Sequence, residues 1–514
     1  MQYQIDQFKI LASEPQDLKE ILQRQYKLKA FTYQILSRSI DARKRESVYY
    51  VYRLLVETEE AVKGKNVSPY NLKNEDLEYK KWDDPLSPVV VGFGPAGIFA
   101  SLYLARCGAK PIIIERGGSI EERVLAVESF LKNRELNPNS NVQFGEGGAG
   151  AFSDGKLTCN RKHPLIEFIF KELVAHGANP DILYDSMPHV GTDVLRIVVK
   201  NIRHEIEKLG GTFYFNTTFL DWENLQDSIK VLTTGPSLTT RYLLLGIGHS
   251  ARDTIRTLYK KLPMEAKAFS MGVRIEHLAE TIDQAQYGKF HSYLPKAYYK
   301  LATHKNGRGI YTFCMCPGGY VLASQSEPNT IVTNGMSNQK REGVNSNSAL
   351  LVDVRPEDYG TNPLDGIAYQ EKYEALAYSL SSSYAAPANL MKEFMEDQVA
   401  KQYRSVTPTY PHGIHFCDLR GCLPEYVIEG LKEGILEFNQ RLKGFYNEDA
   451  ILIGIESRSS SPVRILRDKE TKTAVEHVYP IGEGAGYAGG IISASLDGLL
   501  TAIRIVGENN ECKN

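Results

Sequence analysis

One stretch of the chain joins a buried strand, a glycine turn, a helix and a second buried strand: residues 89–115, VVVGFGPAGIFASLYLARCGAKPIIIE. Gly92 permits a tight turn, Gly94 lets the backbone approach a pyrophosphate, and Gly97 allows close contact between helix and strand. Glu115 ends the second strand, where a carboxylate can accept both hydroxyls of an adenosine ribose, which argues against a 2′-phosphate. The order of these parts predicts a dinucleotide-binding βαβ unit rather than a glycine-rich turn that binds nothing.

The length and charge of the chain limit its function classes. Its 514 residues fit about two to four domains. Because 60 Lys and Arg face 62 Asp and Glu, no overall field favours nucleic acid or an anionic membrane surface. The first residues lack a secretion signal, and no apolar run approaches the roughly 18 residues of a membrane span. We therefore expect a cytoplasmic protein with no nucleic-acid or membrane partner.

The segment before the βαβ unit, residues 1–85, has the pattern of a small α/β module. The expected elements are strands at 3–11 and 47–56, a helix at 14–26 capped by Ser13, and a polar linker at 63–84. The basic stretch 39–45 could contact a nucleic acid or a partner. A solvated turn is the favoured interpretation of that stretch.

A second glycine cluster follows at 141–157, NVQFGEGGAGAFSDGKL. Its glycines are too frequent for the interior of a helix or strand. Such a loop lets its backbone lie flat against a planar ring or a phosphate, and Ser153, Asp154 and Lys156 supply polar anchors at its end. We favour contact with a cofactor over a flexible surface loop, because apolar residues give the loop points for packing.

The chain after this loop predicts further elements of the nucleotide-binding region. We expect a helix at 192–209, strands of a small sheet at 212–219 and 228–234, and a buried strand at 241–246. The segment GIGHSARD at 246–253 could be a second fingerprint, for NAD(P)H. Its first glycine is displaced and no ribose-binding acid ends a following strand, so a return of the chain to the first sheet is favoured.

The block VYPIGEGAGYAGG at 478–490 joins a strand end, a carboxylate and the start of a helix at 491–506. Glu483 can accept a ribityl hydroxyl, and the helix that begins near Gly490 directs its positive end at the group ahead of it. In a flavoprotein that group is the N1–C2=O edge of the isoalloxazine, where negative charge accumulates on reduction. These features favour FAD over NAD.

The seven cysteines form neither an even framework nor a C-x-x-C pair, so we expect reduced thiols. Cys314 and Cys316 could exchange electrons with a flavin, and Cys417 with Cys422 could bind a metal if more ligands converged. Small buried side chains are the favoured interpretation for all four. No metal site is predicted.

Six long motifs lie at 89–97, 141–157, 246–253, 313–321, 456–465 and 480–491. Together they resemble the FAD-dependent dehydrogenase family of bacterial proteins, within the two-dinucleotide-binding-domain flavoprotein group. The resemblance implies a tightly bound FAD, with Glu115 on the adenosine ribose, Gly94 at the pyrophosphate and Glu483 near the ribityl chain, where related flavoproteins commonly have Asp. The expected cofactor-binding residues are Gly92, Gly94, Pro95, Ala96, Gly97, Glu115, Arg116, Gln143, Phe144, Gly145, Gly147, Gly148, Gly150, Ser153, Gly155, Lys156, Gly248, Gly482, Glu483, Gly490 and Ile491.

The predicted fold is α/β, with a Rossmann-like FAD-binding domain that is split in sequence. Its expected parts are residues 86–260 and 441–514, with an inserted α+β substrate domain at 261–440 and the small N-terminal α/β module at 1–85. The inserted domain carries polar and aromatic stretches without a nucleotide signature. That composition is typical of a substrate-facing domain.

The resemblance supplies a reaction class but no substrate. We expect an FAD-dependent oxidoreductase, a dehydrogenase or reductase, that transfers a hydride between FAD and a small organic molecule, with NAD(P)H or another carrier as a candidate electron partner. Candidate catalytic groups are Lys156, His249, Arg458 and Arg464. The arginines could clamp a carboxylate or phosphate or pair structurally, and the histidine could carry a proton or serve in packing. An FAD-dependent monooxygenase and an RNA- or partner-binding protein with a structural flavin remain alternatives.

Overall fold

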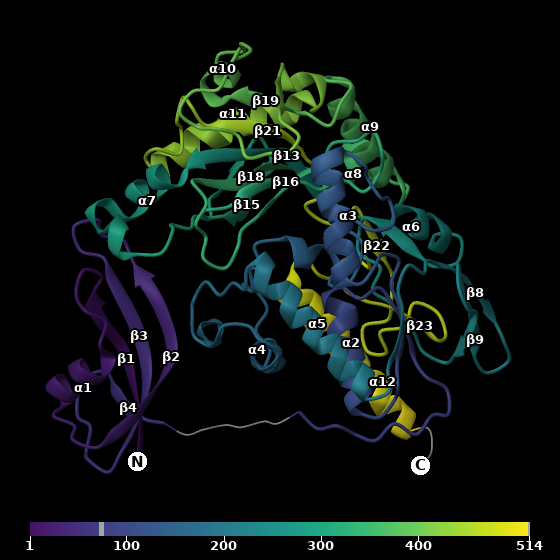
Figure 1. Cartoon of the computed structure of the whole chain (residues 1–514), viewed down its shortest axis with the longest axis horizontal. Helices are drawn as coiled ribbons and strands as arrows, with labels where there is room; N and C mark the ends of the chain where they lie inside the picture. The colour runs from purple at the N-terminus through teal and green to yellow at the C-terminus, as the bar shows by residue number, and fades with distance from the viewer. Residues whose placement is uncertain (71–76, 512–514) are drawn as a thin grey trace.

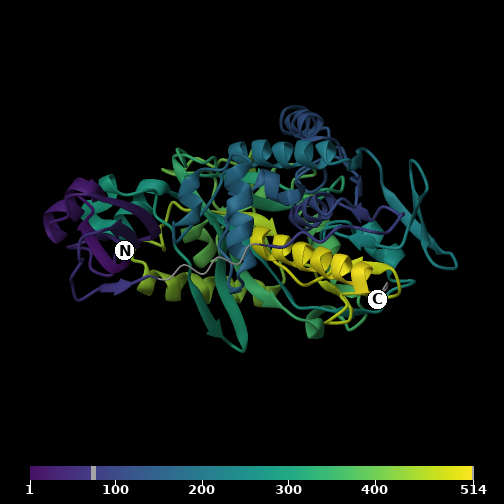
Figure 2. The ribbon, with the colours of Figure 1, turned by 90° about the horizontal axis from the view of Figure 1, so that it is seen from below.

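The computed structural model describes residues 1–70 and 77–511. A seven-stranded sheet lies above a layer of long helices, and an N-terminal module stands at one end of the molecule (Figure 1). The view from below shows α12 (Ile491–Glu511) along the underside, well away from that module (Figure 2). Within the described ranges, no helix is long and apolar enough to cross a membrane.

A five-stranded parallel sheet joins segments that are far apart in the sequence. Its order is β23 (Val478–Pro480), β11 (Leu243–Leu245), β5 (Val89–Val91), β6 (Ile112–Ile114) and β7 (Thr212–Tyr214). All three residues of β5 and all three of β11 are buried, as expected for parallel strands covered on both faces. The predicted return of the chain to the first sheet after residue 240 is therefore confirmed.

Each face of the parallel sheet has its own cover. Apolar side chains of α2 (Pro95–Arg106), α4 (Leu165–Ala175), α5 (Thr192–Lys208) and α12 pack on one face. The other face packs against an antiparallel sheet of β8 (Phe219–Asn224), β9 (Ile229–Thr233) and β10 (Leu238–Thr240). The single strand expected at 212–219 is wrong, because its first half is β7 of the parallel sheet and its end begins β8. The chain changes direction between them at Asn216, which has a positive φ of 51°.

The seven-stranded sheet forms the upper layer. Its order is β14 (Ala302–Lys305), β15 (Arg308–Cys316), β18 (Asn345–Val354), β13 (Phe269–Leu278), β21 (Ile451–Glu456), β19 (Ala386–Leu390) and β20 (Ile414–Phe416). β21 pairs with both β13 and β19, so the sheet of the inserted region extends beyond the boundary expected at residue 440. The motif at 313–321 forms the end of β15, a turn and the start of β16 (Tyr320–Ala323), and β16 pairs with β17 (Thr333–Met336).

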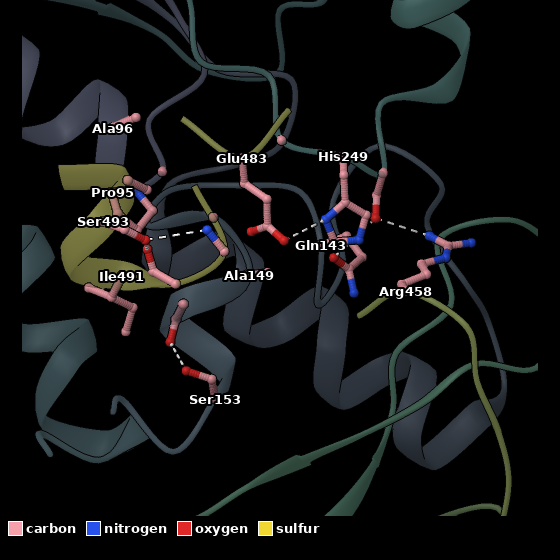
Figure 3. A pocket seen from close by; sticks show the side chains of 18 of the residues that line it. Pro95, Ala96, Gln143, Ala149, Ser153, His249, Arg458, Glu483, Ile491 and Ser493 are labelled. Carbon is pink, nitrogen blue, oxygen red and sulfur yellow. Dashed lines mark hydrogen bonds and ion pairs between the residues drawn. The ribbon is translucent and has the colours of Figure 1, made fainter. Parts of the chain in front are cut away.

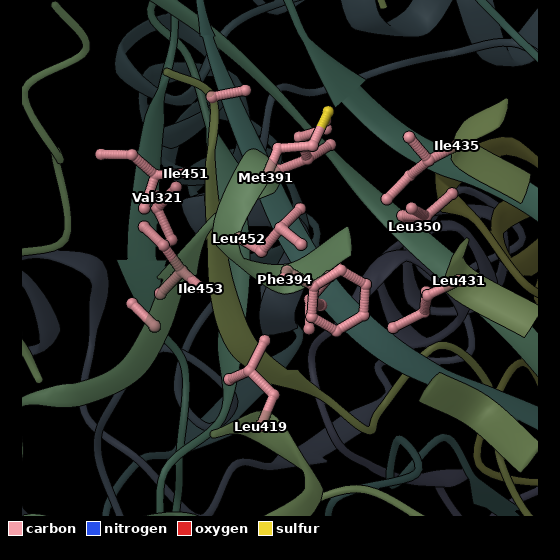
Figure 4. Close-up of a cluster of buried hydrophobic side chains, with 14 of the residues drawn as sticks. Val321, Leu350, Met391, Phe394, Leu419, Leu431, Ile435, Ile451, Leu452 and Ile453 are labelled. Atoms are coloured by element: carbon pink, nitrogen blue, oxygen red, sulfur yellow. The ribbon is translucent and has the colours of Figure 1, made fainter. Parts of the chain in front are cut away.

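The core of this layer lies between the sheet and the helices α10 (Met391–Met395) and α11 (Glu425–Arg441). Figure 4 shows Leu350 of β18 beside Leu431 and Ile435 of α11, and Leu452 of β21 beside Met391 of α10. The remaining helices and strands are α3 (Ile120–Asn133), α6 (Arg252–Leu258), α7 (Ala279–Tyr287), α8 (Pro356–Tyr359), α9 (Asp365–Ser379), β12 (Met264–Ala266) and β22 (Val463–Ile465), with 3-10 turns η1 (Gly148–Phe152), η2 (Pro180–Leu183), η3 (Gly288–Tyr293) and η4 (Leu419–Gly421).

The N-terminal module is an antiparallel sheet with one helix packed on the face that points away from the rest of the molecule (Figure 1). The sheet order is β2 (Phe31–Asp41), β3 (Tyr49–Thr58), β1 (Gln2–Leu11) and β4 (Val67–Pro69), and the helix is α1 (Leu18–Tyr26). The expected helix start is wrong, because Asp17 rather than Ser13 caps α1 by accepting from Glu20 N. β2 was not predicted, and β4 lies in the expected linker, of which residues 71–76 lie outside the described residues.

Arg38 of β2 fastens the module to the nucleotide-binding half. Its guanidinium donates to Asp185 at 2.6 Å and to Asp181 at 3.1 Å, and its backbone N–H donates to Tyr184 O. In the basic stretch, Arg43 pairs with Asp41 of the same stretch at 2.7 Å. The module also packs through Val48 against Phe290 of η3, so it touches both the nucleotide-binding half and the inserted region.

Two glycines of α12 provide a matched test of its packing on α2. A Cβ on Gly498 would lie 2.0 Å from the carbonyl oxygen of Ala96, whereas a Cβ on Gly507 would meet no atom within 4 Å. We expect Gly498→Ala to lower stability by roughly 1–3 kcal/mol through overpacking. Gly507→Ala should leave stability unchanged or raise it by up to about 1 kcal/mol. Thermal denaturation compares the two variants, and equal midpoints would contradict this close contact.

Candidate functional site

A cavity of about 550 Å³ lies where the carboxyl ends of the parallel strands meet the seven-stranded sheet. One wall comes from the turns after β5, β6 and β11 and from the segment before α12, and the opposite wall comes from β15 and β17. Figure 3 shows side chains of these segments pointing into one space. Ligands of open α/β sheets bind at this end of the strands, and the volume is typical of a cofactor or small-molecule site.

Most of the predicted site residues meet in this cavity. Those that line it are Gly92, Gly94, Pro95, Ala96, Glu115, Arg116, Gln143, Phe144, Gly145, Gly148, Gly150, Ser153, Gly155, Lys156, Gly248, His249, Arg458, Glu483, Gly490 and Ile491. Gly97, Gly147, Gly482 and Arg464 are not among its lining residues. Gly97 instead allows the close helix–strand contact, because a Cβ there would lie 2.0 Å from Gly92 O.

Two glycines face each other at the start of α2. A Cβ on Gly94 would lie 3.6 Å from the Cα of Gly148, and a Cβ on Gly148 would lie 2.9 Å from the Cα of Gly94. Gly94 is also the N-cap residue of α2, where backbone N–H groups are free for an anion. The backbone is therefore bare of side chains at the place where a pyrophosphate needs close approach.

Glu115 is buried and holds three backbone segments together. Its carboxylate accepts from the N–H groups of Phe93 at 2.9 Å, Gly117 at 3.0 Å and Gly145 at 2.9 Å. A carboxylate has about four acceptor positions, so these bonds leave one for a ribose hydroxyl. The expected contact with both hydroxyls stays a prediction, and it requires one of these backbone bonds to be exchanged.

Arg123 of α3 organises the glycine-rich loop, and sequence reasoning missed it. Its fully buried guanidinium donates to the carbonyl oxygens of Asn141, Val142, Glu146 and Gly148 at 2.7–2.9 Å. Burial lowers the pKa of Arg123 to about 9. Its position at the buried face of α3, in register with Ile120, Val127 and Phe130, is the signal that could have found it.

His249 and Glu483 form a polar pair on the wall of the cavity. Nδ1 of His249 lies 3.1 Å from Oε1 of Glu483, as the dashed line in Figure 3 marks. Nε2 of the same ring is buried and has no hydrogen-bond partner among the described residues. The predicted ribityl acceptor therefore has a histidine beside it, which orients the carboxylate and leaves one ring nitrogen unused.

Arg458 lines the cavity but is held in an ion-pair network. It donates to Glu374 at 2.8 Å, to Glu327 and to Ser326, and Arg252 binds the same Glu374 at 2.7 Å. Burial alone would raise the pKa of Glu374, but the two arginines outweigh burial and hold that pKa well below its usual range. This arrangement favours structural pairing over a substrate clamp.

The other predicted arginine lies away from the cavity. Arg464 is on β22 and pairs with Glu265 of β12 at 2.9 Å, so its expected place in the catalytic site is wrong. Cys314 and Cys316 line the cavity, whereas Cys417 and Cys422 do not. In the part of the chain that the structure describes, no group of three or more His, Cys, Asp or Glu side chains gathers as a metal site would need.

Lys156 is a cation without a hydrogen-bond partner among the described residues. Its Nζ is buried and makes no hydrogen bond to any described residue, and the nearest carboxylate oxygen is that of Asp154 at 4.0 Å. Asp154 is already bound by Arg341 at 2.7 Å and by Ser337. Nζ of Lys156 lies 5.1 Å from the ring centroid of Tyr298, at the end of the cavity bounded by β15.

Sequence comparison defines the family of the chain. Residues 268–459 match the family described as FAD-dependent protein, C-terminal domain-like, and residues 2–57 match a domain of unknown function. An uncharacterised protein of Clostridium beijerinckii is 46% identical over 488 residues, which cover 92% of this chain and 92% of that protein. The chain belongs to the same family as that bacterial protein.

Several solved structures align with most of this chain at low identity. The halogenase PltM in complex with phloroglucinol and FAD aligns with 84% of this chain and 70% of its own, at 10% identity and a TM-score of 0.37. The tetracycline destructase Tet(51) aligns over 84% of each chain at 12% identity and a TM-score of 0.36. The anhydrotetracycline hydroxylase OxyS from Streptomyces rimosus aligns with 82% of this chain and 63% of its own, at 12% identity and a TM-score of 0.33.

FAD is the cofactor of this protein, since the family that residues 268–459 match is described as FAD-dependent. The residues of the cavity fit it. The facing backbones of Gly94 and Gly148 leave room that a Cβ would fill, and Nε2 of His249 is buried without a hydrogen-bond partner among the described residues.

Gly94→Val tests the pyrophosphate position. We expect this variant to purify with little or no flavin, because the branched side chain fills the space where backbone meets pyrophosphate. The fold should persist, since the Cβ itself meets only the Cα of Gly148 at an ordinary 3.6 Å. Flavin absorbance per protein measures retention, circular dichroism checks folding, and Gly507→Ala is the control. A full complement of flavin in Gly94→Val would refute the assignment.

Proposed function

We propose that this protein is an FAD-dependent oxidoreductase that exchanges a hydride with a small organic anion. In this proposal the parallel sheet with α2, α5 and α12 is a Rossmann-like FAD-binding domain split in sequence, and the seven-stranded sheet roofs the reaction site. The meeting of β5, β11 and β23 in one sheet supports the split. A diffusible electron carrier such as NAD(P)H completes the cycle.

The observation that carries the proposal is the ammonium group of Lys156, which has no hydrogen-bond partner among the described residues. A buried charge without hydrogen bonds is costly, and Asp154 offers little compensation because Arg341 and Ser337 already hold it. Two further basic side chains, those of Arg161 and Lys300, also line the cavity and are exposed. A carboxylate or phosphate of the substrate would supply the missing acceptor.

The residues of the site have separate roles in this reaction. FAD, when bound, supplies the centre that accepts or donates the hydride. Lys156 binds and orients the substrate anion, Tyr298 packs beside the ammonium, and the pair of Glu483 with His249 positions polar groups on the opposite wall. Arg458 fixes the wall through Glu374 and does not bind substrate.

Lys156→Met tests the anion site directly. Benzoate and inorganic phosphate serve as probes, and their binding is followed by changes in flavin absorbance of the holoprotein. We expect the dissociation constant of the probe that binds to rise by about 10- to 100-fold in Lys156→Met, since a charged hydrogen bond contributes roughly 1.5–3 kcal/mol. Lys156→Arg should retain most of the affinity, because it keeps the charge.

Lys171 provides the matched control, because it is an exposed lysine of α4 that pairs with Glu167. Lys171→Met should bind the probes as the wild type does. If neither anion perturbs the wild-type flavin, or if Lys156→Met binds them unchanged, the anionic substrate class is wrong.

Two measurements separate a dehydrogenase from a monooxygenase: flavin bleaching without oxygen, and oxygen uptake in air. Organic carboxylates and phosphates are offered to the holoprotein without oxygen, and flavin bleaching is recorded. We expect bleaching by the substrate itself, as a dehydrogenase requires. A compound that leaves the flavin oxidised, yet accelerates NAD(P)H-dependent oxygen uptake and gains a hydroxyl, would establish the monooxygenase instead.

A further inference from the structure

Cys314 and Cys316 stand on β15 where this strand borders the cavity, and both line it. Cys314 is exposed, whereas Thr312, Met315 and Cys316 around it are buried. Because the strand runs inside the sheet, between β14 and β18, the exposure of Cys314 is to the cavity.

The backbone turns Cys314 out of the regular strand. Its φ is +42°, in the left-handed region that side chains other than glycine rarely adopt. The pairing of β15 with β18 also shifts register between Phe313 and Cys316, which is the mark of a β-bulge. Bulges re-aim side chains next to functional sites, and strained residues of this kind persist only where the surroundings hold them.

Arg274 of β13 holds this bulge. It is fully buried, donates to the carbonyl oxygen of Cys314, and lies 3.5 Å from Sγ of Cys316. Glu456 at 2.8 Å and Asn347 at 2.9 Å fix the guanidinium in turn. Two protein cations, Arg274 and Lys156, therefore influence both thiols at the cavity wall.

We propose that Cys314 and Cys316 are a redox pair that exchanges two electrons with FAD by forming and breaking a disulfide. Residues two apart along a strand have Cα atoms about 6.6 Å apart. A disulfide joins Cα atoms about 4.4–6.8 Å apart, and the bulge shortens the strand at this point. The inference rests on the bound FAD and on neither Lys156 nor the identity of the organic substrate.

The step balances without a further reactant. Reduced FAD gives two electrons and two protons to the disulfide, the S–S bond breaks, and oxidised FAD and two thiols result. Burial raises the pKa of the Cys316 thiol, so Cys316 keeps its proton at neutral pH. A bridge across one intervening residue closes a small ring, and strained disulfides are the more oxidising ones. Electrons therefore pass from flavin to sulfur.

A single-equivalent reduction of the holoprotein tests the transfer. The protein is oxidised with diamide, desalted, and given about one equivalent of dithionite per flavin without oxygen. We expect the flavin of the wild type to bleach and then recover as the disulfide takes the electrons, and full reduction to need about four electrons per flavin. Cys314→Ser and Cys316→Ser should stay bleached and need about two.

Thiol counting locates the electrons, and Cys159→Ser is the matched control. Cys159 also lines the cavity but belongs to the loop after Lys156, so its variant should behave as the wild type does. Alkylation and peptide mass analysis should find two fewer free thiols than the seven of the sequence after oxidation, with residues 314 and 316 joined. The proposal is overturned if the wild-type flavin stays bleached with all seven thiols free, or if the bridge joins Cys417 to Cys422.

Discussion

The buried guanidinium of Arg123 shapes the loop on which the cofactor site depends. It gathers four carbonyl oxygens of residues 141–148 around one charge, so the amide groups of the loop turn the other way, as Gly145 does toward Glu115. A loop so rich in glycine has little conformational preference of its own. An arginine with carbonyl oxygens as its acceptors therefore replaces the regular hydrogen bonding that a helix or strand would supply.

The cavity forms because strands from distant segments of the sequence end at the same edge of the parallel sheet. β5, β11 and β23 belong to segments that begin near residues 89, 243 and 478, and their parallel pairing brings the three following turns to one side. Close glycine contacts then draw the layers together: Gly97 lets α2 approach β5, and Gly498 lets α12 approach α2. The inserted sheet adds the opposite wall, where the thiols of Cys314 and Cys316 face the cavity.

The sequence predicted the helices and strands whose own residues carry a clear hydrophobic pattern. β5, α2 and β6 follow from local rules, and so do α5 and α12, because each buries a clear apolar run or stripe. β2 was missed because none of its side chains is buried, so its strand character depends on its pairing with β3. The position of β21 between β13 and β19 could not be predicted for a related reason. A buried apolar strand fits the parallel sheet and the seven-stranded sheet equally well, and only its pairing in the folded chain decides between them. The place of Arg123 on the apolar face of α3 could have shown that it is buried, but its carbonyl partners and those of Glu374 appear only in the folded chain.

The two arginines that bind Glu374 connect separate parts of the chain. Arg252 belongs to α6 beside the nucleotide-binding sheet, Glu374 to α9, and Arg458 to the segment after β21. Separating the two halves would break both ion pairs of a buried carboxylate. The network thus ties the nucleotide-binding half to the inserted region beside the cavity. Because Arg458 also lines that cavity, the ion pairs that hold the halves together fix one part of its wall.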